Sequence, residues 1–116
     1  MGFLTTHVLN TASGRPAADV LIELFRVDED RSHLGSARTN EEGRCEEPLL
    51  SGADFTIGEY ELVFHAGDYF AGDGLQLPEP RFLDRVVIRV GVSDAGQHYH
   101  VPLLISPFSY STYRGS

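Results

Sequence analysis

The sequence predicts an all-β fold: an antiparallel two-sheet β-sandwich of about eight strands with one short helix, forming a single domain over residues 1–116. Apolar and β-branched residues recur with a period of two in several short segments, and turn-forming residues separate these segments. A length of 116 residues suits one domain. Hydrophobic residues make up 41% of the chain and charged residues 22%, which is the balance of a folded domain.

The first half of the chain contains two clear strand patterns. Residues 4–9 (LTTHVL) form the first, and the turn signal SGRP follows at 13–16. Residues 20–27 (VLIELFRV) carry apolar side chains on both faces, which indicates a strand buried between layers. Further turn signals at 40–43 (NEEG) and 51–54 (SGAD) contain the residues that tolerate turn geometry.

The middle of the chain combines a strand, a helix and a long connection. Residues 59–64 (EYELVF) alternate in the strand pattern, and we expect a short helix around residues 66–71. The stretch 72–86 contains two Gly and two Pro, so we expect it to be a long loop.

The last part of the chain supplies three more strands. They are predicted at 85–92 (RVVIRVGV), 99–105 (YHVPLLI) and 108–113 (FSYSTY), with a turn at 93–96. Pro102 cannot donate a backbone hydrogen bond, so we expect it at a local edge, at a bulge or on a side of its strand that carries no ladder.

Charge and targeting signals exclude several classes of function. The net charge is −8, and all nine basic residues are Arg without any basic run, so neither nucleic acid nor an anionic membrane is an expected partner. No apolar run approaches the 18 residues of a membrane span. The N-terminus lacks the pattern of a signal peptide, and the single Cys45 can form no intrachain disulfide. We therefore expect a cytoplasmic protein.

Histidine and arginine are the candidates for chemistry. Period-two geometry puts His98 and His100 on one face of their strand, while His7 lies in the first strand. Imidazole titrates near neutrality and is a natural general base for water. Arg44 follows a turn, where its guanidinium could hold a carbonyl or an anionic heterocycle. Structural histidines and a solvated surface Arg are the alternative interpretation.

Two other chemistries are weaker. A zinc site would need His7 beside His98 and His100, and no Glu or Asp lies at metal-ligand spacing, so no metal is predicted. Nucleophilic catalysis is poorly supported because Ser109 and Ser111 are not in a Gly-x-Ser-x-Gly elbow. Cys45 lies between Arg44 and acidic residues, and we expect its thiol to be inert.

Motifs at both ends of the chain resemble those of a known family. LTTHVL (4–9) with SGRPA (13–17) resembles the N-terminal signature of the transthyretin-related 5-hydroxyisourate hydrolases. HYHVPLL (98–104), SPF (106–108) and YSTYRGS (110–116) resemble their C-terminal signature. The final Tyr-Arg-Gly-Ser separates the hydrolases from transthyretin, the hormone carrier. The resemblance covers essentially the whole chain.

The resemblance implies a cofactor-free hydrolase of urate degradation, assembled as a homotetramer with sites between its dimers. It assigns catalytic roles to His7, Arg44, His100 and Ser111, and substrate binding to His98, Tyr113 and Arg114. Asn10 departs from the family pattern, which has Asp there, so this chain lacks that negative charge near the end of its first strand. A non-catalytic small-molecule carrier of the transthyretin type is the alternative function.

Overall fold

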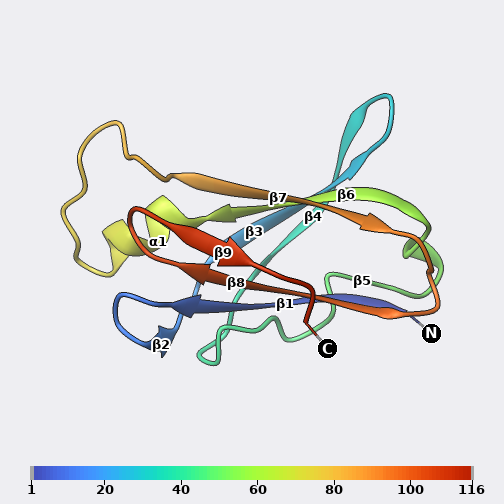
Figure 1. The fold of residues 1–116 in the computed structure, drawn as a ribbon, viewed down its shortest axis with the longest axis horizontal. Helices are drawn as coiled ribbons and strands as arrows, with labels where there is room; N and C mark the ends of the chain where they lie inside the picture. Colours follow the sequence, from blue (N-terminus) through green and yellow to red (C-terminus); the bar gives the residue numbers. More distant parts are fainter. Residues whose placement is uncertain (1, 116) are drawn as a thin grey trace.

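Two β-sheets pack face to face in the computed structural model, which describes residues 2–115 (Figure 1). One sheet contains β1 (Phe3–Asn10), β2 (Arg15–Pro16), β5 (Leu50–Ser51), β8 (His98–Ile105) and β9 (Tyr110–Thr112). The other contains β3 (Leu21–Val27), β4 (Arg31–Arg38), β6 (Gly58–His65) and β7 (Arg85–Val92). The helix α1 (Ala66–Gly72) and the long connection after it lie at one end of the sandwich, and η1 (Gly52–Asp54) is a single 3₁₀ turn.

The structure confirms the predicted sandwich, its helix and the six strands read from the alternation. Each of these elements begins and ends within two residues of the predicted bounds. The sequence missed β4, whose residues are almost all exposed at a sheet edge and therefore show no apolar alternation. It also missed β2 and β5, which have two residues each and carry too few side chains for any period.

The prediction of a wholly antiparallel sandwich is wrong at one pair of strands. β1 and β8 run parallel, in a register that pairs Phe3 with His98 and Asn10 with Ile105. All strands of the second sheet lie between β1 and β8 in the sequence. The chain then returns to the first sheet as β8, which runs in the same direction as β1. Parallel pairing of strands so far apart leaves no local sequence signal, because each strand's alternation is the same for either direction.

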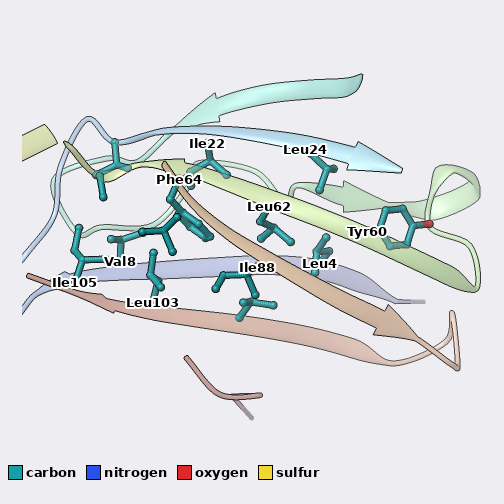
Figure 2. Packing of buried hydrophobic residues seen from close by; sticks show 14 of the residues in the cluster. Leu4, Val8, Ile22, Leu24, Tyr60, Leu62, Phe64, Ile88, Leu103 and Ile105 are labelled. Atoms are coloured by element: carbon teal, nitrogen blue, oxygen red, sulfur yellow. The ribbon is translucent and has the colours of Figure 1, made fainter. Parts of the chain in front are cut away.

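The core lies between the two sheets and decides which side chains face outward. Figure 2 shows the buried apolar side chains of β1 and β8 facing those of β3, β6 and β7. Burying each large aliphatic or aromatic side chain contributes about 1.5–3 kcal/mol. Along β1, Leu4, Thr6, Val8 and Asn10 are buried. The alternate residues Phe3, Thr5 and His7 must therefore lie on the outer face of the sheet.

Pro102 lies on a part of β8 that has no ladder on one side, as expected. The pairing of β8 with β9 covers only Leu103–Ile105, and Pro102 is the residue of β8 just before this paired stretch. The Pro102 carbonyl instead accepts a hydrogen bond of 2.7 Å from the Thr112 hydroxyl. The proline thus ends the β9 ladder without leaving its own carbonyl unpaired.

We expect the stability of the protein to fall in acid through Glu61. Its side chain, 12% exposed, accepts from Arg31 Nε at 2.8 Å and lies 3.1 Å from Arg89 Nη2. The hydrogen bond from Arg31, followed by that from Arg89, lowers the pKa of Glu61. The unfolded chain therefore binds a proton at higher pH, so this stabilisation is complete above the ordinary Glu pKa of about 4.3 and is lost as the pH falls further.

Urea unfolding at pH 7 and at pH 3.5 checks this expectation. Glu61→Gln should lower the free energy of unfolding clearly at pH 7 and much less at pH 3.5. Glu59→Gln, an exposed carboxyl on the same strand, is the matched control and should change little at either pH. A Glu61→Gln effect of equal size at both pH values would contradict the assigned ion pairs.

Candidate active site

The candidate site lies on the outer face of the sheet that contains β1 and β8. The parallel register sets Thr5 opposite His100 and Phe3 opposite His98, and His7 follows two residues along β1 on the same face. An isolated β-bridge joins His7 to Arg44, in the segment after β4. Four of the residues singled out in the sequence, His7, Arg44, His98 and His100, are therefore brought together from three separate segments.

Thr5 links two of these histidines and was missed by the sequence reasoning. Its hydroxyl oxygen lies 2.7 Å from His98 Nε2 and 2.8 Å from His100 Nδ1. The sequence does put Thr5 on the face of His7, two residues earlier. Only the parallel register of β1 and β8 places that hydroxyl between the two imidazole rings.

A tight turn positions Arg44 beside β1. Asn40 Oδ1 accepts hydrogen bonds from the Glu42 and Arg44 backbone N–H groups at 2.9 and 3.1 Å. Gly43 has φ +77°, and a Cβ there would lie 2.4 Å from the Val8 carbonyl oxygen. Only glycine therefore lets this backbone approach β1 closely enough to set Arg44 against His7.

The C-terminal segment packs directly on His100. The Gly115 N–H donates to the His100 carbonyl at 2.8 Å. A Cβ on Gly115 would lie 2.6 Å from Cδ2 of the His100 ring, so only glycine at this position avoids a clash with the imidazole. Ser116, the last residue of the terminal motif, lies outside the described residues.

The electrostatic environment keeps His100 neutral. Partial burial, followed by the nearby charge of Arg44 and the rings of His98 and His7, lowers the pKa of His100. A neutral imidazole at physiological pH is able to accept a proton, as a general base must. Burial and then the Glu46 carboxylate raise the pKa of the Cys45 thiol, which supports the expectation of an unreactive cysteine.

These side chains surround an open hollow of about 270 Å³. It is lined by Thr5, Thr6, Arg44, Cys45, Glu47, His98 and His100. The lining combines imidazole groups with a guanidinium, a combination suited to moving a proton and stabilising negative charge on a small polar molecule. Among residues 2–115, no group of three His, Cys, Asp or Glu side chains is arranged to hold a metal ion.

Comparison with known proteins agrees with the motifs at the two ends of the chain. The model of the HIUase/Transthyretin family matches residues 4–115. The chain belongs to the HIUase/transthyretin family.

Relatives in the HIUase/transthyretin family are similar over their full length. A 5-hydroxyisourate hydrolase of Mesorhizobium japonicum is 62% identical, with 99% of this chain and 93% of the relative covered. The structure of Klebsiella pneumoniae 5-hydroxyisourate hydrolase is 34% identical, covers both chains completely and superposes with a TM-score of 0.82. Sea bream transthyretin is 23% identical, covers 97% of this chain and 93% of its own, and superposes with a TM-score of 0.85, which shows the shared fold alone.

Three of the residues assigned by the family resemblance, Ser111, Tyr113 and Arg114, do not line this hollow. Ser111 pairs with Leu104, four residues along β8 from His100 and hence about 13 Å away. Arg114 stacks on the Tyr99 ring, with its guanidinium carbon 4.1 Å from the ring centroid. Its guanidinium donates to Gln97 at 2.9 Å and to the His98 carbonyl at 3.4 Å. Tyr113 is 62% exposed. One chain therefore brings His7, Arg44, His98 and His100 together, whereas these three residues are not among those that line the hollow.

Asn10 has a structural role at the end of β1. Its side chain is fully buried, and Oδ1 accepts from the Ala12 and Ser13 backbone N–H groups at 2.9 and 3.2 Å. Its amide nitrogen donates to the Tyr69 hydroxyl at 3.0 Å. A carboxylate could accept the first two bonds, and the third would reverse, with the Tyr69 hydroxyl donating, but the charge would be costly to bury. Asn10 therefore ties β1 to α1 as a neutral group.

The helices within residues 2–115 are all too short to cross a lipid bilayer. This family member thus shows no helical membrane span in the part of the chain that the structure describes.

Proposed function

We propose that this protein hydrolyses 5-hydroxyisourate to 2-oxo-4-hydroxy-4-carboxy-5-ureidoimidazoline in the cytoplasmic degradation of urate, without a cofactor. The observation that carries the proposal is the open hollow lined by His98, His100 and Arg44, with His7 bridged to Arg44 beside it. The similarity to proteins named 5-hydroxyisourate hydrolase over the full length of the chain supports the same substrate.

The two histidines share the proton transfers of the reaction. Water adds to a ring carbonyl of the substrate, and the lactam C–N bond then breaks. His100, neutral and half-buried, takes the proton from the attacking water. His7, on the same outer face of β1 as Thr5 and bridged to Arg44, orients that water or supplies a proton to the departing nitrogen. Water thus provides both the hydroxyl group added to the carbonyl carbon and the proton added to the departing nitrogen.

Arg44 supplies the positive charge of the site. The guanidinium is a planar fork of donors that matches the carbonyl and imide edge of the substrate. As water adds, the carbonyl oxygen becomes negative, and a cation already in place stabilises that oxygen without reorganising. The turn from Asn40 to Arg44 fixes the backbone from which the side chain projects.

The remaining assigned residues enter the site from other copies of the chain in a homotetramer. Within one chain, Ser111, Tyr113 and Arg114 are not among the residues that line the hollow, and Ser111 lies about 13 Å along β8 from His100. The Phe108 and Tyr113 side chains are 61% and 62% exposed and leave aromatic surface for a partner chain to cover. Tetramer formation would bury these aromatic groups and close the hollow at the contact between dimers.

The decay of freshly generated 5-hydroxyisourate tests the proposed activity. We expect the purified protein to accelerate the loss of substrate absorbance far beyond the rate in buffer, in proportion to enzyme concentration. Heat-unfolded protein at the same concentration is the control. A decay no faster than in buffer would contradict the hydrolase and favour a carrier of the transthyretin type.

A further inference from the structure

The Thr5 hydroxyl lies between two imidazole nitrogens that can each donate or accept. Oγ1 is 2.7 Å from His98 Nε2 and 2.8 Å from His100 Nδ1, both within ordinary hydrogen-bond distance. A threonine hydroxyl has one proton, and a neutral imidazole has one N–H. If the hydroxyl donates to one ring, the facing nitrogen of the other ring must be the donor for both contacts to be hydrogen bonds.

This arrangement couples the tautomers of the two rings. When Thr5 donates to His100 Nδ1, both rings have their proton on Nε2. When Thr5 donates to His98 Nε2, both rings have it on Nδ1, and the outer nitrogen of His100 is free to accept. The second state leaves His100 Nε2 able to act as a base.

We propose that Thr5 is a positioning residue that passes a proton from His100 to His98 during turnover. The proposal rests on the function proposed above. After His100 Nε2 has taken a proton from water, the His100 Nδ1 proton moves to Thr5 Oγ1, and the Thr5 hydroxyl proton moves to His98 Nε2. The charge is transferred from one ring to the other, and Thr5 again has one proton. The extra proton stays on His98 until His100 Nε2 gives its proton to the departing nitrogen. The two transfers through Thr5 then reverse, and both rings again have their proton on Nδ1.

Burial and charge favour that direction. His98 is exposed, whereas His100 is half-buried. The groups that face these rings from the neighbouring segments are His7, Arg44, Cys45 and Glu47. Arg44 and the loss of water both disfavour a positive charge on His100, so the cation is more stable on the outer ring. The Phe3 ring packs edge-on against His98, with centroids 6.0 Å apart, and holds its orientation.

Nitrogen NMR of the ligand-free wild-type protein tests the coupling without any substrate. Ring ¹⁵N shifts near pH 8 identify the tautomer of each histidine. We expect His98 and His100 to share one tautomer, either both Nε2–H or both Nδ1–H. Opposite tautomers on the two rings would overturn the proposal whether or not the protein hydrolyses 5-hydroxyisourate.

Two variants test the role in turnover. Thr5→Val keeps the shape and removes the hydroxyl, and it should lower kcat about tenfold or more while KM changes little. Thr5→Ser restores a hydroxyl and should retain kcat within about twofold. Thr11→Val, whose hydroxyl bonds only to the Ile105 carbonyl, is the matched control and should keep the wild-type rate. If Thr5→Val kept the wild-type kcat and the wild-type tautomers, the relay would be wrong.

Discussion

Replacing His100 with Asn is expected to lower kcat/KM for 5-hydroxyisourate by on the order of 10²–10⁴-fold. Asn can still donate and accept hydrogen bonds, but it cannot take a proton from water at neutral pH. The lowered pKa of His100 keeps the wild-type ring neutral and ready for that step. His7→Asn should produce a loss of similar order, because the two rings share the transfers.

His33→Asn is the matched control for these two variants. His33 is an exposed histidine on β4, in the other sheet, where its Nε2 lies 3.4 Å from the Glu23 carboxylate. This variant should keep wild-type activity, since it removes an imidazole that does not face the hollow. Circular dichroism and thermal unfolding of all three proteins show whether folding is retained. Near-wild-type turnover in both His7→Asn and His100→Asn would contradict the proposed mechanism.

The pH dependence of kcat/KM should reflect the protonation of His100. The free enzyme needs His100 neutral, so kcat/KM should fall in acid, with the limb lying below the ordinary histidine pKa of about 6.5 because burial and Arg44 hold that pKa down. The site is therefore expected to stay active at a slightly acidic pH at which an unperturbed imidazole would already be protonated.

Local alternation was sufficient to predict most of the fold, because buried strands have apolar side chains on fixed faces. It predicted β1 and β7 closely since their alternate residues pack into the core. It failed at β4 because an edge strand can pair through its backbone while its side chains stay in water. It also could not give the parallel direction of β1 and β8, which depends on the path of the chain through the other sheet.

The candidate site shows the same division between local and distant information. Period two alone placed His98 and His100 on one face. The resemblance to the family supplied His7 and Arg44 as their neighbours, and the register of β1 and β8 with the turn at Gly43 explains why they meet. Thr5 was missed because a threonine in a strand is ordinary, and its importance arises only from the two nitrogens beside it.

Activity is expected to disappear almost completely when the protein is diluted until its tetramer dissociates. Within one chain Ser111 lies about 13 Å along the strand from His100, so a substrate held at the histidines would lack the serine and the closing wall. Specific activity, measured over a range of concentrations, should follow the fraction of tetramer found by sedimentation at the same concentrations. Full specific activity in a sample that contains only monomers would contradict the shared site.

Subunit mixing then tests whether the serine and the histidine come from different copies. The His100→Asn protein and the Ser111→Ala protein should each have low activity alone, because the first lacks the proposed base and the second lacks the serine. Co-refolding the two variants produces mixed oligomers in which some sites pair an intact His100 of one chain with an intact Ser111 of another. Those sites should regain activity, and co-refolding either variant with itself is the matched control. If both residues had to come from one chain, no mixed oligomer could recover. That result would mean that the open hollow on the sheet of one chain is the whole site.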